Sequence, residues 1–134
     1  MKKNLFGFSL IELLVVLAII AILASISWPL YTEHLIKTRR AQAKVALMQL
    51  SSRLERYAMT YHSYQGATLN NLGLPSLIAN DYYRLQIISI SSDHYEIAAI
   101  PQKNQTQDRQ CGTLMFNQNG QQRISGTEKV TYCW

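Results

Sequence analysis

A single carboxylate near the N-terminus lies where charge is least expected. Glu12 precedes an apolar segment that runs without charge from Leu13 to Thr32. A carboxylate in a membrane helix costs about 2.5–3.5 kcal/mol on insertion scales, so such an acid indicates a function and a positively charged partner. The partner that we predict is the amine of Phe8, four residues before Glu12, which becomes a positive amino terminus if the chain is cut after Gly7. In a bundle of such helices, each acid would pair with the amine of a neighbour.

Two cysteines form the second candidate pair. Cys111 and Cys133 lie near the C-terminus of a chain that carries an export signal, which favours a disulfide in an oxidising compartment. Such a bridge encloses 21 residues and stabilises the fold by about 3 kcal/mol in the chain-entropy model. Metal binding is less favoured, because no histidine lies near either cysteine in the sequence and a structural zinc site needs four ligands. We predict neither a metal nor a cofactor.

The uncharged segment has the length of a membrane helix. Its 20 residues would span about 30 Å, which is one bilayer core. Lys2 and Lys3 belong to a short basic leader, Met1 to Asn4, and positive charge ahead of an apolar helix holds that end in the cytoplasm. The C-terminal part of the chain is therefore expected to face outward.

A secretory signal peptide and a plain membrane anchor are the alternatives for this segment. A signal peptide would be cleaved near the small residues at 21–24, but Glu12 falls inside its hydrophobic region, and that region exceeds the expected length of about 7–15 residues. A plain anchor explains the length and the orientation but neither Gly7 nor Glu12.

Proline interrupts the helical pattern at position 29. Pro29 lacks a backbone donor and clashes with the preceding turn, so we expect it to kink or locally melt the helix between Ser25 and Trp28. The hydroxyls of Ser25 and Ser27 would then bond the freed carbonyls. The simpler alternative is that the membrane helix ends here, but helical periodicity resumes directly afterwards.

The rest of the chain predicts an α+β domain. An amphipathic helix is expected from Leu35 to about His62, with an apolar stripe that packs on a sheet and a separate polar face that is solvated. The stripe consists of Ala43, Leu47, Leu50, Leu54, Tyr57 and Tyr61, and the polar face of Arg39, Gln42, Gln49, Arg53, Arg56 and Thr60. A connecting loop, Ser63 to Asn80, follows.

Two hairpins are predicted after this loop. The strand candidates are Tyr83 to Ser91, Tyr95 to Ile100, Thr113 to Phe116, and Gln121 to Ser125. Asn119 and Gly120 suit a tight turn in the second hairpin, since Gly accepts a positive φ. Together these strands make an antiparallel sheet of about four strands, with a disulfide loop at its C-terminal end.

The segment 7–12, Gly-Phe-Ser-Leu-Ile-Glu, resembles the class III signal of type IV prepilins and type II secretion pseudopilins. This resemblance implies cleavage after Gly7 by a prepilin peptidase, N-methylation of Phe8, and a Glu12 that guides each subunit into a growing filament. Pro29 also lies where pilins commonly carry a kinking proline. Three parts are then expected: a leader at 1–7, a transmembrane and filament-core helix at 8–34, and a globular domain at 35–134.

The C-terminal half resembles PilE/ComP-type minor pilins. The segments that carry this resemblance are Glu55-Arg56-Tyr57, Ser63-Tyr64, Leu72-Gly73-Leu74-Pro75, Tyr82-Tyr83, Ala99-Ile100-Pro101, Asp108, Cys111-Gly112-Thr113-Leu114 and Cys133-Trp134. The resemblance implies the type IV pilin fold and a minor pilus subunit that serves assembly, twitching, adhesion or DNA uptake. Its partners would be other pilin subunits, the prepilin peptidase and the inner-membrane assembly machinery. The chain would reside in the inner membrane with a periplasmic C-terminal domain, and afterwards in the surface pilus.

Three other functions are less favoured. An enzyme is unsupported, because the usual catalytic motifs are missing and the three histidines are scattered. A type II secretion pseudopilin shares the N-terminal signal, but the C-terminal cysteine pair and the lack of a compact acidic calcium loop count against it. A DNA-uptake receptor is permitted by charge, since residues 35–134 carry 11 basic and 6 acidic side chains. The candidate phosphate contacts are Lys103, Arg109, Arg123 and Lys129.

Overall fold

The computed structural model describes residues 7–134, so the predicted basic leader lies outside the described residues. The chain divides into a first unit, whose described part is 7–35, and a second unit, Ile36–Trp134. The helix α1, Leu10–Tyr61, contributes to both units.

Within the first unit, α1 continues through Pro29 without a break in its helical assignment. The local melting that we expected between Ser25 and Trp28 is therefore not found, and a kink at Pro29 stays a prediction. Ser25 Oγ donates to the carbonyl of Ile22 at 2.7 Å and Ser27 Oγ to that of Leu23 at 2.9 Å. Both hydroxyls thus bond the helix, but not at the Ser25 carbonyl that Pro29 leaves without its donor.

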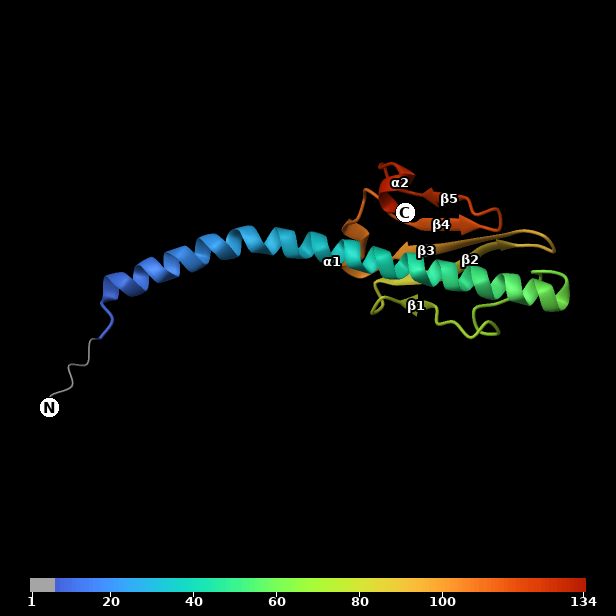
Figure 1. Cartoon of the computed structure of the whole chain (residues 1–134), viewed down its shortest axis with the longest axis horizontal. Coiled ribbons are helices and arrows are strands. Elements are labelled where there is room, and N and C mark those ends of the chain that lie inside the picture. Colours follow the sequence, from blue (N-terminus) through green and yellow to red (C-terminus); the bar gives the residue numbers. More distant parts are fainter. Residues whose placement is uncertain (1–6) are drawn as a thin grey trace. The chain divides into compact units, whose positions relative to one another are not determined.

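The second unit is built on one antiparallel sheet with the strand order β1-β2-β3-β4-β5 (Figure 1). The strands are β1 Leu77–Ile78, β2 Tyr83–Ile90, β3 Tyr95–Pro101, β4 Leu114–Asn117 and β5 Gln122–Ile124. Four of them are the predicted strands. The fifth, β1, lies inside the segment 63–80 that we expected to be only a loop; it is two residues long, which is too short for a recognisable period-two pattern.

The core of the second unit lies between α1 and the sheet. Ala43, Leu47, Leu50 and Leu54 of α1 are fully buried, and they pack with buried strand residues. Those strand residues are Tyr83, Leu85, Tyr95, Ile97, Ala99 and Leu114. The predicted stripe was wrong at its end, because Tyr61 in the last turn of α1 is 64% exposed. Its ring contacts Tyr57 instead, with the centroids 4.5 Å apart.

Hydrogen bonds at one buried tyrosine join α1 to β3. The Tyr95 hydroxyl lies 2.8 Å from Ser51 Oγ and donates to Glu55 Oε1 at 3.2 Å. Tyr64 donates to the other oxygen of Glu55 at 2.9 Å. Burial raises the pKa of Tyr95 to about 12, so its hydroxyl stays protonated at neutral pH.

Two short helices complete the unit, neither of which we predicted. The 3-10 helix η1, Lys103–Gln107, follows β3, and the helix α2, Val130–Cys133, ends the chain. In the turn between β4 and β5, the amide of Gly120 donates to the Asn117 carbonyl at 3.0 Å. Gly120 has a φ of 74°, as the predicted tight turn requires.

Candidate assembly site and basic surface

Ser9 caps the N-terminal end of α1. The amide of Glu12 donates to Ser9 Oγ and the amide of Leu13 donates to the Ser9 carbonyl, each at 3.2 Å. These bonds put Ser9 at the N-cap and Glu12 at the third helical position, the Ser-x-x-Glu spacing of a capping box. The charge of Glu12 therefore lies at the positive end of the helix dipole. We did not predict the role of Ser9, although this spacing indicates it.

The apolar part of α1 is uncovered. Every residue from Gly7 to His34 is exposed in the structure, with Leu10 at 81% and Trp28 at 74%. By length and composition alone, the segment qualifies as a membrane span, with a mean hydropathy of 2.8 over its most apolar window. An apolar surface of this extent has to be covered, either by lipid or by other helices. Glu12 is the one acid in its first turn.

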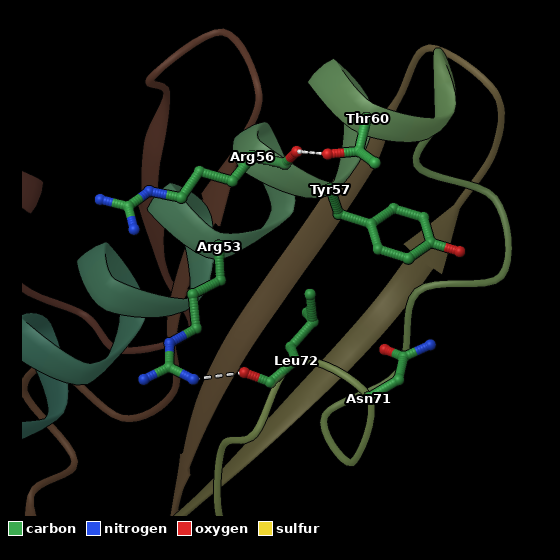
Figure 2. Close-up of a pocket in the computed structure, with 6 residues that line it drawn as sticks. All are labelled: Arg53, Arg56, Tyr57, Thr60, Asn71 and Leu72. Atoms are coloured by element: carbon green, nitrogen blue, oxygen red, sulfur yellow. Dashed lines mark hydrogen bonds between the residues drawn. The ribbon is translucent and has the colours of Figure 1, made fainter.

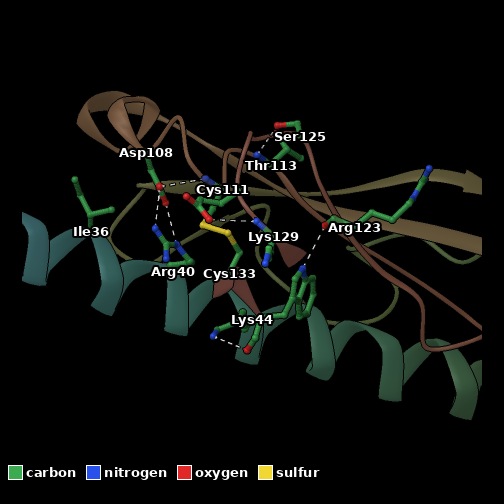
Figure 3. The surroundings of a disulfide bond; sticks show 12 residues. Ile36, Arg40, Lys44, Asp108, Cys111, Thr113, Arg123, Ser125, Lys129 and Cys133 are labelled. Atoms are coloured by element: carbon green, nitrogen blue, oxygen red, sulfur yellow. Dashed lines mark hydrogen bonds and ion pairs between the residues drawn. A yellow bond between two sulfur atoms is a disulfide. The ribbon is translucent and has the colours of Figure 1, made fainter. Parts of the chain in front are cut away.

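The predicted disulfide joins Cys111 and Cys133, whose Cα atoms are 5.6 Å apart (Figure 3). Both cysteines are completely buried. The bridge ties α2 to the residues just before β4, so that the C-terminal end of the chain is fixed to the sheet.

A buried ion pair lies beside the disulfide (Figure 3). Arg40 of α1 donates from Nε to Asp108 Oδ2 at 2.9 Å and from Nη2 to Oδ1 at 2.8 Å. The two side chains are only 7% and 2% exposed, and Oδ1 also accepts from the Cys111 amide at 3.4 Å. This bidentate ion pair links α1 to the segment that contains Cys111. Its partners are 68 residues apart, and no local sequence pattern reveals such a pair.

The four predicted phosphate contacts lie on different elements. Lys103 begins η1, Arg109 follows η1, Arg123 is in β5, and Lys129 precedes α2. Arg123 forms an ion pair with Glu96 of β3, and its side chain points away from the disulfide in Figure 3. Among residues 7–134, no hydrogen bond or ring contact joins these four cations to one another. The structure thus does not bring them together as one contact site.

A different basic cluster forms around Tyr82. The guanidinium of Arg39 lies 3.4 Å from the centroid of the Tyr82 ring, and the Lys103 amine lies 5.4 Å from the same centroid. Lys103 also pairs with Asp81 at 3.6 Å. We expected Arg39 to be merely solvated, but it is half-buried against this ring. The sequence did not reveal the cluster because α1, the turn before β2, and η1 each supply one part of it.

Within the part of the chain that the structure describes, no group of three His, Cys, Asp or Glu side chains is placed to hold a metal ion.

Comparison with known proteins identifies the family. Residues 2–28 match the prokaryotic N-terminal methylation motif. Residues 29–115 match the family described as type IV minor pilin ComP, DNA uptake sequence receptor. This chain belongs to that family. A curated relative is the type IV wide pilus major component PilA4 of Thermus thermophilus, which is 39% identical over 98 residues, 69% of this chain and 71% of the relative.

The type IV pilin fold is also found in a similar solved structure. The non-core minor pilin PilV of Neisseria meningitidis aligns with a TM-score of 0.57 over 72% of this chain and 92% of that chain. The sequences are 22% identical in this alignment, so the match concerns the fold. It agrees with the helix-on-sheet architecture of this chain.

These findings confirm the prediction of a type IV pilin of the ComP minor-pilin type. As such, the chain is a structural protein that assembles with other pilin subunits into a pilus filament. Its apolar helix and methylation motif fit a pilin that is anchored in the inner membrane and forms a surface pilus. The processing at Gly7 and Phe8, the role of Glu12 and any contact with DNA stay predictions.

Proposed function

We propose that this chain is a minor structural subunit of a type IV pilus that a prepilin peptidase cleaves after Gly7. The new amino terminus at Phe8 is methylated, and the inner-membrane machinery adds the subunit to the filament through the N-terminal half of α1. The observation that carries this proposal is the capped, exposed apolar helix whose first turn contains Glu12.

Assembly exchanges one apolar environment for another. In the membrane, lipid covers the apolar side chains of α1 but offers Glu12 no positively charged group from another chain. In the filament, helices of neighbouring subunits cover the same side chains, and the amine of a neighbour's Phe8 pairs with Glu12. The apolar side chains are covered to a similar extent in the membrane and in the filament. The ion pair between Glu12 and a neighbour's Phe8 therefore favours the filament and fixes the register between neighbouring helices. Twitching, adhesion and DNA uptake are then roles of the assembled filament.

The experiment that tests this proposal determines the N-terminal residue of the chain in filaments sheared from cells. We expect the chain to be present there and to begin at methylated Phe8. A type II secretion pseudopilin, the alternative with the same N-terminal signal, would be absent from surface filaments because it builds a short periplasmic structure.

The second candidate function, DNA contact, is favoured by the cluster of Arg39, Tyr82 and Lys103. Cations within about 6 Å of a ring centroid are attracted to its face, so the ring holds both charges in place. Prepositioned cations suit the phosphates of a nucleic acid, which supply most of the affinity of such complexes. The matched family is described as a DNA uptake sequence receptor, and this chain's net charge of +5 is compatible with that role.

Backbone conformation supports a binding role for the same cluster. Ala79, Asn80 and Asp81, which lead into Tyr82, have φ values of 53°, 55° and 64°, and Lys103 has a φ of 51°. Non-glycine residues seldom adopt this left-handed region, and those that do cluster at ligand-binding sites. The two stretches meet where Lys103 pairs with Asp81.

A gel-shift titration of the full chain in nonionic detergent with a short DNA duplex tests this second function. Replacement of Lys103 by Gln together with Arg39 by Gln should weaken binding at least tenfold, because two phosphate contacts are lost. With two phosphates neutralised, affinity should also fall roughly 12-fold between 50 and 200 mM salt. Exposed Arg84 on β2 provides the matched control, since Arg84→Gln removes a charge outside the cluster. Equal weakening by Arg84→Gln and by either cluster substitution would refute a role for the cluster.

A further inference from the structure

A second, separate concentration of positive charge lies beside the last turns of α1. A shallow pocket of about 320 Å³ opens between this part of the helix and the loop that follows it (Figure 2). It is lined by Arg53, Arg56, Tyr57, Thr60, Asn71 and Leu72. This volume is at the lower end of the range of small-molecule sites, about 300–1,000 Å³.

Arg53 is held in place by the loop. Its Nη1 donates to the carbonyl of Leu72 and, at 3.2 Å, to that of Gly73. The chain comes close to the guanidinium here, since a Cβ added to Gly73 would lie 3.0 Å from Nη1. Gly73 also has a φ of 67°, a conformation that side chains disfavour. The other nitrogens of the guanidinium make no hydrogen bond within residues 7–134, so they remain available to a ligand.

Arg56 supplies a second guanidinium without a counter-charge. It is exposed and lies one helical turn after Arg53, on the same face of α1. In residues 7–134 no acid pairs with either guanidinium; the acid that precedes Arg56, Glu55, is engaged by the hydroxyls of Tyr64 and Tyr95. Two like charges at this spacing disfavour the helix by a few tenths of a kcal/mol, and a bound anion removes that repulsion.

The rest of the pocket offers contacts for more than a bare anion. Figure 2 shows both guanidinium groups directed to one side of the pocket and Tyr57 and Asn71 on the other side. Asn71 is fixed, because its Oδ1 accepts from the Thr68 amide at 2.7 Å and its Nδ2 donates to the Gly66 carbonyl at 3.0 Å. A ligand held by its anion at the arginines can therefore place an adjoining sugar or ring against Tyr57.

We propose that this pocket binds the phosphate group of a small phosphate ester, with Arg53 and Arg56 as the phosphate ligands and Tyr57 beside the ester group. Planar guanidinium forks match the oxygens of a phosphate, and two such forks with free donors suit a dianion. A nucleotide and a lipid headgroup both carry this chemistry. The site shares no residue with the Arg39, Tyr82 and Lys103 cluster, so this proposal can be correct even if that cluster does not bind duplex DNA.

The test is an NMR chemical-shift titration of the full chain in a maltoside detergent, which contains no phosphate. The probes are thymidine 5′-monophosphate and glycerol 3-phosphate, with thymidine as the ligand that lacks the anion. We expect saturable shifts of the Thr60, Asn71 and Leu72 amides with both esters and none with thymidine. Tighter binding of the nucleotide indicates a nucleic-acid source, and tighter binding of glycerol phosphate indicates a lipid source.

Substitutions then assign the phosphate contact. Arg56→Gln should weaken ester binding at least tenfold without loss of fold, since its guanidinium has no partner in the described residues. Arg84→Gln, which removes an equal charge from an exposed position of β2, should change the affinity less than twofold. Equal affinities of the Arg56→Gln and Arg84→Gln chains, or equal binding of thymidine and its phosphate, would overturn the proposal.

Discussion

Replacement of Glu12 by Ala is expected to reduce the amount of this chain in pilus filaments at least tenfold, while cleavage after Gly7 proceeds normally. A carboxylate at the centre of a membrane helix costs about 2.5–3.5 kcal/mol. Glu12 lies in the first turn of α1 and bears part of that cost, which the amine of a neighbour's Phe8 removes in the filament. Loss of a driving force larger than about 1.4 kcal/mol corresponds to more than a factor of ten. Quantification of the chain in sheared filaments and in membranes measures the change.

Glu12→Gln is the matched variant, because it preserves the length of the side chain and removes only the charge. We expect it to fail in assembly as Glu12→Ala does. Ser27→Ala, a neutral change on the same exposed helix, should leave incorporation unchanged. Normal incorporation of the Glu12→Gln chain would show that the charge of Glu12 does not drive assembly.

Replacement of Asp108 by Ala should destabilise the second unit by about 3–5 kcal/mol, because Arg40 then remains buried without a counter-charge. For a domain of this size, a loss of about 3 kcal/mol lowers the melting temperature by at least about 12 °C. Near-ultraviolet circular dichroism of the full chain in detergent follows this unfolding through the buried aromatic residues of the core, Tyr83 and Tyr95.

The exposed pair of Lys103 and Asp81 provides the control. Asp81→Ala deletes the same chemical group at a site where both side chains are more than half exposed, so the loss should stay below about 1 kcal/mol. The double variant Arg40→Met with Asp108→Leu should recover most of the stability, since apolar pairs often replace buried ion pairs without cost. Equal melting temperatures of the Asp108→Ala and Asp81→Ala chains would show that the buried ion pair does not stabilise the second unit.

Periodic elements of the fold were predictable from the sequence. The stripe from Ala43 to Leu54 has the spacing that burial on one face of a helix imposes, and it is buried as expected. The strand that begins at Tyr83 was recognisable from its isoleucine and tyrosine content. The short elements β1, η1 and α2 were missed, because two to five residues are too few to repeat the period of a strand or a helix. Tyr61 continues the helical spacing, but its position in the last turn of α1 leaves it exposed, and spacing alone does not reveal that.

The candidate sites divide in the same way. Glu12 and the two cysteines are recognisable because each differs sharply from its local surroundings. The pair of Arg40 with Asp108 and the contact of Arg39 with Tyr82 arise only when distant segments meet, so no local pattern marks them. For Lys103 and Arg123, the sequence predicted charge but not their partners Asp81 and Glu96, which neutralise part of it.

The mass of the N-terminal peptide, recovered from this chain in sheared pili, tests the assembly proposal most directly. The proposal predicts a peptide that begins at Phe8 and is heavier by one methyl group. A filament-borne chain that still contains the residues before Phe8, or that begins within or after the apolar segment, would contradict it.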